Sequence, residues 1–136
     1  MEKVFVDTDI ILDLLANRDP FYKHAAILFS EADKSNIELY VSSLSFSNLN
    51  YLLSKQYSPD QSRKKLLKFK TLVTVLAVTD KIVELALSSD FKDFEDGLQY
   101  FTATENGVKR LLTRNLKDYK AAEIIVMTAE QFLKGK

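Results

Sequence analysis

The chain has 136 residues, of which 46% are hydrophobic and 28% charged, a composition typical of a soluble globular domain. It contains no cysteine, which excludes disulfides and thiolate metal sites. The 19 basic and 19 acidic residues give a net charge of zero, so any binding to nucleic acid must use a local basic patch.

The N-terminal segment does not have the pattern of a signal peptide. Its apolar run is interrupted by Asp7, Asp9 and Asp13, and no small-residue cleavage site follows. No stretch reaches the roughly 18 uncharged apolar residues that a bilayer span needs. We therefore expect a cytoplasmic protein without a membrane partner, folded as one domain over residues 1–136.

Short apolar runs alternate with segments of helical periodicity along the whole chain. The runs predict β-strands at 4–6, 39–41, 73–76 and 110–112, with a weaker fifth candidate at 124–126. Apolar residues three or four apart predict helices at 10–15, 21–32, 46–53, after Pro59, at 82–87, at 94–105 and from about Thr128. This alternation predicts an α/β fold, in which a parallel sheet of four or five strands is covered by helices on both faces as a three-layer sandwich.

Polar segments follow several of the predicted strands. They are 7–9 after the first strand, 42–48 after the second and 113–118 after the fourth, while 93–96 opens the helix before the fourth strand. In an open parallel sheet, ligands bind outside the carboxyl ends of the strands. We therefore expect these four segments to meet at one edge of the sheet.

Asp7 is the first functional candidate. Its ordinary explanation would be a cap on the following helix, but Thr8 and Asp9 can serve as caps equally well. An unpaired carboxylate at the end of a buried strand is costly unless a cation neutralises it. We interpret Asp7 as functional, and Asp9 and Asp13 as more ordinary acidic residues.

Asp96 is the second candidate. Asp93 and Asp96 lie three residues apart on one helix face, and capping explains Asp93 better than it explains Asp96. Asn115 and Asp118 follow a strand in a polar turn, where turn chemistry alone accounts for either residue. The single histidine, His24, is interpreted as a surface or interface residue.

A cluster of carboxylates without His or Cys suits a hard cation. Oxygen ligands with open positions favour Mg²⁺ or Mn²⁺ over zinc. With substrate phosphates as further ligands, such ions activate water and stabilise charge during attack on phosphorus. The sequence therefore predicts a Mg²⁺ or Mn²⁺ site held by Asp7, Asp96 and Asp118.

Three segments of the sequence resemble, in order, the motifs of the PIN domain family. This family includes the ribonuclease toxins of many bacterial and archaeal toxin–antitoxin pairs. "VFVDTDIILDLL" resembles the first motif, "VSSLSFSNLNYLLSK" the second, and "DFEDGLQYFTATENGVKRLLTRNLKDYK" the third and fourth. The resemblance implies a PIN-like sandwich and a Mg²⁺- or Mn²⁺-dependent endoribonuclease. It also implies RNA as substrate, a homodimer, and a small antitoxin protein as partner.

The resemblance places the family's first acid on Asp7 and its third on Asp96. The second acid, normally Glu, falls on Asn48, and the acid of the last motif falls on Asn115, with Asp118 one helical turn further on. Each amide offers a carbonyl oxygen but removes a negative charge, which weakens metal binding. Asn48 and Asn115 would then be neutral ligands or orient water, and Asp118 would assist.

Thr113 and Arg114 also belong to this interpretation, because they lie where a phosphate could be held.

Two alternative functions stay open. The amides at two acid positions leave open a catalytically silenced PIN-fold module that binds RNA or protein. The stretch "VFVDTDII" also resembles the Asp-x-Asp of haloacid-dehalogenase-type phosphatases, in which the first Asp is a nucleophile.

The sequence contains two basic clusters. The first is Arg63, Lys64, Lys65, Lys68 and Lys70, whose spacing is typical of a solvated helix face. The second lies beside the candidate site, and its role stays open at this point; it consists of Lys109, Arg110, Arg114, Lys117 and Lys120.

Overall fold

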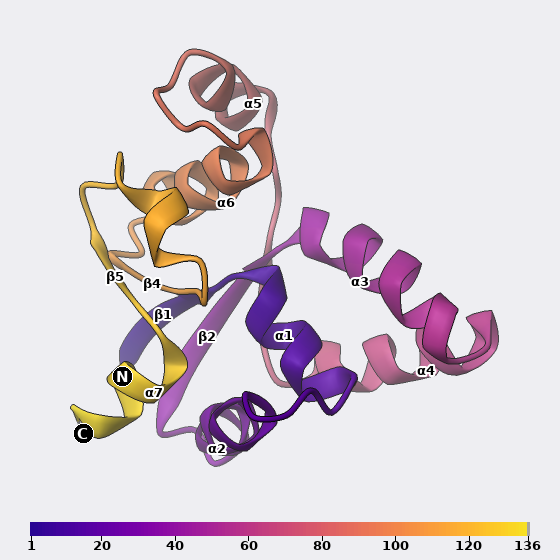
Figure 1. Ribbon diagram of the computed structural model, residues 1–136. Coiled ribbons are helices and arrows are strands. Elements are labelled where there is room, and N and C mark those ends of the chain that lie inside the picture. The colour runs from indigo at the N-terminus through magenta and orange to yellow at the C-terminus, as the bar shows by residue number, and fades with distance from the viewer. Residues whose placement is uncertain (136) are drawn as a thin grey trace.

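A computed structural model describes residues 1–135 and has a parallel five-stranded sheet at its centre (Figure 1). The strands are β1 (Glu2–Val6), β2 (Ile37–Ser42), β3 (Thr74–Leu76), β4 (Arg110–Leu112) and β5 (Ile125–Met127). Their order across the sheet is β3-β2-β1-β4-β5, and every neighbouring pair is parallel. The strand that comes first in the sequence therefore occupies the middle of the sheet.

Seven α-helices surround this sheet in the described part of the chain. They are α1 (Thr8–Leu15), α2 (Tyr22–Asp33), α3 (Ser43–Gln56), α4 (Pro59–Lys70), α5 (Asp80–Leu87), α6 (Phe94–Glu105) and α7 (Ala129–Lys134). A short 3₁₀ helix, η1 (Leu116–Tyr119), follows β4. Figure 1 shows α5 and α6 together on one side of the molecule, away from α2 and α4.

Both faces of β1 are buried, and each face contributes to a different core. Val4 and Val6 pack with apolar side chains of α1, α2, α3, α4 and α7, whereas Phe5 points to the opposite face and packs with Tyr100 and Ala103 of α6. The side chains of Val4, Phe5 and Val6 have no exposed surface. Strands buried on both faces read as continuous apolar runs, which is why this segment shows no alternation of apolar and polar residues.

The predicted fold class is confirmed, including the weaker fifth strand. The main differences lie at element boundaries. Helices α1 and α3 begin at Thr8 and Ser43, earlier than the apolar periodicity indicated. Their first turns carry polar side chains that serve capping and the site, so apolar spacing alone does not reveal them.

The chain adds strands first on one side of β1 and then on the other, so the sheet changes its direction of growth between β1 and β4. From β1 the chain first adds β2 and β3 on one side, and then adds β4 and β5 on the other. This reversal is the position at which ligands bind in doubly wound sheets, because the connections leave the sheet on opposite sides. The chain reaches β4 through Gly107, whose φ of +71° is readily adopted only by glycine.

None of the helices in the described part of the chain combines the length and apolar character that crossing a membrane would need.

Candidate active site

A cleft of about 420 Å³ lies at the carboxyl edge of the sheet, above the junction of β1 and β4. Its walls come from α1, α3, α6 and the segment after β4. The lining residues are Asp7, Thr8, Asp9, Leu12, Arg18, Asn48, Tyr51, Leu52, Asp93, Glu95, Asp96, Gln99, Asn115 and Asp118. The four polar segments expected at this edge therefore do meet there.

Asp7 forms the floor of the cleft and is only 6% exposed. It is the N-cap of α1, and its Oδ1 accepts a hydrogen bond from the Thr8 backbone N–H at 2.7 Å. The expectation that Thr8 or Asp9 would provide this cap, leaving Asp7 without a structural task, was wrong. The cap uses one oxygen, while Oδ2 accepts hydrogen bonds from the Thr113 hydroxyl at 2.9 Å and the Tyr119 hydroxyl at 3.0 Å.

Tyr119 connects the two principal acidic residues. Its hydroxyl lies 3.0 Å from Asp7 Oδ2 and 3.5 Å from Asp96 Oδ1. The ring is buried, and burial together with the two neighbouring carboxylates raises the pKa of the Tyr119 hydroxyl, which therefore keeps its proton and acts as a donor. The sequence motifs gave Tyr119 no function.

The two acids are crowded enough to resist ionisation. Burial, followed by the charge of Asp9, raises the pKa of Asp7 to about 7 despite the hydrogen bonds that Asp7 accepts. Burial, followed by the charges of Asp7, Asp93 and Asp118, raises the pKa of Asp96 to about 7. A cation bound between the two would favour their charged forms.

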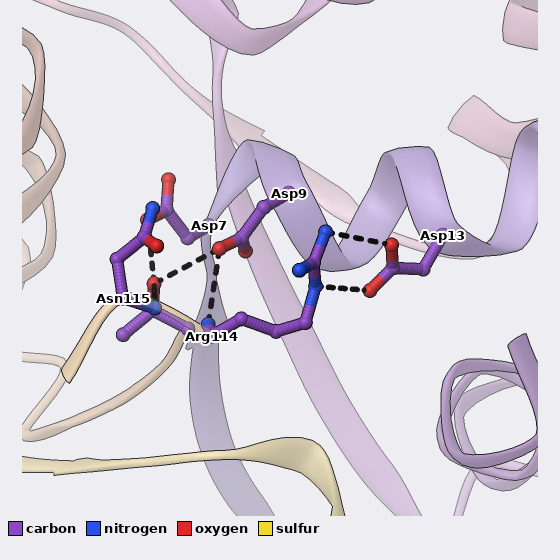
Figure 2. A network of polar contacts seen from close by, with 6 residues as sticks. Asp7, Asp9, Asp13, Arg114 and Asn115 are labelled. Atoms are coloured by element: carbon purple, nitrogen blue, oxygen red, sulfur yellow. Dashed lines mark hydrogen bonds and ion pairs between the residues drawn. The ribbon is translucent and has the colours of Figure 1, made fainter. Parts of the chain in front are cut away.

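A second network links α1 to the segment after β4, and Figure 2 shows it at close range. Asp9 Oδ2 accepts hydrogen bonds from the Arg114 backbone N–H at 3.0 Å and from the Thr113 hydroxyl at 3.3 Å. The Arg114 guanidinium makes two bonds to Asp13, at 2.8 and 3.1 Å, and lies 4.0 Å from the Phe21 ring centroid. Arg114 therefore holds the β4–η1 segment against α1.

The sequence placed Thr113 and Arg114 where a phosphate could be held, but neither residue lines the cleft. Thr113 is fully buried beneath Asp7, and the Arg114 side chain points along α1 toward Asp13 rather than into the cleft (Figure 2). The guanidinium that lines the cleft belongs to Arg18, in the loop between α1 and α2. Sequence reasoning missed Arg18 because its position depends on the path of that loop.

The remaining predicted residues lie on the walls and rim of the cleft. Asn48 donates from Nδ2 to Glu95 Oε2 at 3.4 Å, whereas Asn115 and Asp118 are exposed. Asp93 is the N-cap of α6 and accepts a hydrogen bond from the Asp96 backbone N–H at 3.0 Å, which confirms its expected capping role.

At the base of the cleft, three polar side chains link α1, α3 and α6. The hydroxyls of Thr8 and Ser45 lie 2.7 Å apart, and Gln99 Nε2 donates to both at 3.0 Å. These residues come from α1, α3 and α6, so this cluster fixes the spacing of three walls. Gln99 gave no signal in the sequence, since its role follows only from helix packing.

The donor set of the cleft consists of oxygen atoms that suit a divalent ion. Among residues 1–135, no three His, Cys, Asp or Glu side chains lie close enough together to hold one ion. Two carboxylates do converge, however, and Asp9 Oδ1 is a buried oxygen without a hydrogen-bond partner. Mg²⁺ is typically held by one or two carboxylates and several waters, so an oxygen-only set of this size fits it.

His24 lies apart from the cleft, on α2. Its Nε2 is 3.4 Å from Glu130 Oε1 of α7, and its side chain is about one-third exposed. This placement agrees with its interpretation as a surface residue.

Comparison with known proteins identifies the family. The sequence profile of the PIN domain matches residues 3–117, and the chain therefore belongs to the PIN domain family. One curated relative is Ribonuclease VapC1 of Aquifex aeolicus (strain VF5), which is 32% identical over 139 residues, covering 96% of this chain and 93% of the relative. This assignment replaces the phosphatase alternative that the first motif had suggested.

Solved structures of similar fold come from toxin–antitoxin systems. VapBC2 from Rickettsia felis, bound to a promoter DNA fragment, superposes with a TM-score of 0.67 at 19% identity, covering 92% of this chain and 96% of that one. VapC20 from Mycobacterium tuberculosis, described as a toxin that cleaves the sarcin–ricin loop, gives 0.67 at 17% identity, covering 90% and 98%. At these identities the likeness establishes the fold alone.

Proposed function

We propose that this chain is an endoribonuclease that depends on Mg²⁺ or Mn²⁺. The observation that carries the proposal is the pair Asp7 and Asp96, brought together by the Tyr119 hydroxyl at the floor of a cleft. The kinship with Ribonuclease VapC1 supports RNA as the substrate, and PIN-domain ribonucleases of this kind generally depend on divalent metal ions. A divalent ion bound here supplies charge neutralisation at the phosphate and polarises the attacking water.

Five residues at the cleft then have defined tasks. Asp7 and Asp96 hold the ion, and the hydroxyls of Thr113 and Tyr119 fix the Asp7 carboxylate by donating to its Oδ2. Preorganised donors of this kind reduce the reorganisation that accompanies the reaction. Asp118, exposed at the rim, assists with its charge.

The amides complete the proposed site. Asn48 turns its Nδ2 toward Glu95, which leaves its carbonyl oxygen as the group available to a water or an ion in the cleft. Asn115 follows β4 at the opposite wall and offers an equivalent carbonyl oxygen. Both amides lower the negative charge of the site relative to carboxylates, so we expect weaker metal affinity than a four-acid site would have.

We further propose that the chain acts as the toxin of a toxin–antitoxin pair and is restrained by a small antitoxin protein. Support comes from the similar structures, two of which are VapBC complexes bound to DNA and one a toxin–antitoxin complex from Klebsiella pneumoniae. A homodimer remains an expectation from the family resemblance. Co-expression with the product of an adjacent small open reading frame, followed by size-exclusion chromatography, tests for the complex.

The test of the enzymatic proposal is RNA cleavage by the full chain with and without divalent ions. We expect cleavage with Mn²⁺ or Mg²⁺, loss of cleavage with a chelator, and loss of both cleavage and calorimetric Mn²⁺ binding in Asp96→Asn. Asp33→Asn is the matched control, since Asp33 is an exposed aspartate at the end of α2. Ion-independent cleavage, or wild-type behaviour of Asp96→Asn, would refute the proposal.

The second candidate function is a catalytically silenced module that binds RNA or protein without cutting. The observation that favours it is the presence of Asn48 and Asn115 where the family usually has acids. Asn48→Glu separates the two functions, because it restores one carboxylate at the wall of the cleft. Strong cleavage by the variant and none by the natural chain would identify a silenced protein, whereas cleavage by both supports the enzyme.

A further inference from the structure

A second hollow, of about 560 Å³, adjoins the cleft and shares Asp118 with it. Its other lining residues come from the α5–α6 loop and from the segment around η1. They are Asp90, Phe91, Lys92, Lys117, Lys120 and Ala121. We call this the lysine hollow.

The charges of the two cavities differ in sign. Six carboxylates and one guanidinium line the cleft, so its walls repel the phosphates of an RNA strand. Three lysines and two aspartates line the lysine hollow. Within residues 1–135, none of these three lysines forms an ion pair with a protein carboxylate, so their charges are available to a ligand.

The lysine hollow is built on the same framework as the acidic residues of the cleft. Lys117 belongs to η1 and Lys120 follows it directly, so these lysines flank Asp118 and Tyr119. On the opposite wall Lys92 follows Phe91, whose ring centroid lies 5.8 Å from that of Tyr119. The distance from the lysines to the acids is therefore fixed by packing, although the lysine side chains themselves are exposed.

We propose that the lysine hollow binds backbone phosphates of the substrate RNA, next to the phosphodiester held over Asp7 and Asp96. The RNA strand passes from the hollow across Asp118 into the cleft. Attraction to the lysines offsets the repulsion from the acidic walls, and lysine–phosphate contacts add affinity without selecting a base sequence. This inference rests on the proposed ribonuclease function and names the surface that supplies its affinity for RNA.

The test replaces Lys92, Lys117 and Lys120 together by Gln in the full chain. We expect the KM for a short single-stranded RNA to rise about tenfold with kcat unchanged, because backbone contacts position the strand and take no part in bond cleavage. Binding of the same fluorescein-labelled RNA is measured by anisotropy in the Asp96→Asn background. A plot of the logarithm of the association constant against the logarithm of salt concentration has a negative slope, and we expect the magnitude of this slope to fall by about 2 in the triple variant. Replacement of the three lysines by Arg should preserve both values.

The matched control replaces Lys64, Lys68 and Lys70 of α4 by Gln. It removes the same charge from an exposed helix face that does not line the cleft. Equal losses in the two triple variants would overturn the proposal, because they would reflect net charge alone. An unchanged KM and an unchanged salt dependence of RNA binding in the Lys92, Lys117 and Lys120 variant would also overturn it. The same holds if this variant binds RNA normally but no longer forms the complex with the antitoxin protein.

The proposed ribonuclease function fails on a different result. If the natural chain cleaves no RNA with Mn²⁺ or Mg²⁺, the enzymatic proposal is refuted, while anisotropy still reports whether the lysine hollow binds RNA. If cleavage depends on Asp96 but not on the three lysines, only the further inference is refuted.

Discussion

Asp7 and Asp13 belong to the same helix segment, and both are almost completely buried, but they are compensated in different ways. Asp13 receives both arms of the Arg114 guanidinium, at 2.8 and 3.1 Å. Asp7 receives a backbone N–H and two hydroxyls, and no basic side chain among residues 1–135 forms an ion pair with it. Burial raises the pKa of both carboxyls, and in Asp13 the guanidinium opposes the rise.

The difference separates a structural carboxylate, Asp13, from the carboxylate that we propose as a metal ligand, Asp7. A buried acid that serves only the fold is most stable with a partner of opposite charge from the same chain. A buried acid that serves a metal site must keep part of its charge unmatched, which costs stability while the ion is absent. The extent of burial does not distinguish the two residues, whereas the identity of their neighbours does.

The largest expected effect is that of Asp7→Asn on RNA cleavage, and Asp13→Asn is the comparison. Asp7→Asn should lower metal-dependent RNA cleavage by about 1000-fold, because a lost metal ligand costs several kcal/mol of transition-state stabilisation. Asp13→Asn should retain most of the activity, since Asp13 does not line the cleft. Single-turnover cleavage assays measure both, with circular dichroism as a check on folding. Equal losses would show that Asp7 and Asp13 do not differ in function.

The next effect is on stability and concerns Arg114. Arg114→Ala leaves Asp13 buried without its partner, and we expect the free energy of unfolding to fall by about 3 kcal/mol. Urea denaturation measures it, and Arg63→Ala on α4 provides a control on an exposed helix face. Arg114→Lys should recover only part of the loss, because an ammonium cannot form the two-armed contact. If Arg114→Ala costs less than 1 kcal/mol, Asp13 is not structurally dependent on the pair.

The unmatched charge of Asp7 predicts a pH dependence of stability in the absence of divalent ions. The pKa of Asp7 is about 7 in the folded chain against an ordinary value of 3.8, so the folded state binds a proton that the unfolded state has released. The contribution of Asp7 to stability is therefore greatest at low pH and is lost as pH rises from about 4 through 7, by about 2.5 kcal/mol between pH 5 and 7.5.

Thermal unfolding at a series of pH values measures this dependence. Asp7→Asn should make the profile shallower and leave the part that Asp96 contributes, because the pKa of Asp96 is also raised to about 7. Mn²⁺ should restore stability at the upper end of the range because it binds only the folded state. A natural chain that becomes more stable from pH 5 to 7.5 without divalent ions would contradict the expectation.

Tyr119→Phe should produce the smallest effect of the series. It removes the hydroxyl that donates to Asp7 Oδ2, leaving that oxygen with the Thr113 hydroxyl alone. We expect a loss of about 1 kcal/mol in unfolding free energy. Because the lost hydrogen bond favours the charged carboxylate, the pH profile of cleavage should shift to higher pH. Tyr22→Phe on α2 is the control, and a cleavage profile that does not move would exclude a role for Tyr119 in positioning Asp7.

Much of this site could be anticipated from the sequence. The strand ends predicted that Asp7, Asn48, Asp96 and Asp118 would share one edge of the sheet, and the cleft contains all four. The prediction succeeded because the C-terminal parts of β1 and β4, Val4–Val6 and Leu111–Leu112, are apolar and buried, and parallel strands bring their carboxyl ends together.

The directions of individual side chains could not be anticipated in the same way. The motif places Arg114 beside the site, but spacing does not reveal that its side chain leaves toward Asp13. The assignment of the α1 cap failed for a related reason, since Asp7, Thr8 and Asp9 are all competent caps and only the backbone path selects Asp7. Arg18 and Gln99 enter the cleft through a loop path and a helix packing that no local pattern encodes.

The pairing of β1 with β4 has a consequence for the order of events during synthesis. The partners of Asp7, Thr113 and Tyr119, are made more than 100 residues after Asp7 itself. A growing chain that has not yet emerged beyond β4 lacks both hydroxyls and one wall of the cleft. The cleft is therefore completed only after the ribosome has released the segment that follows β4.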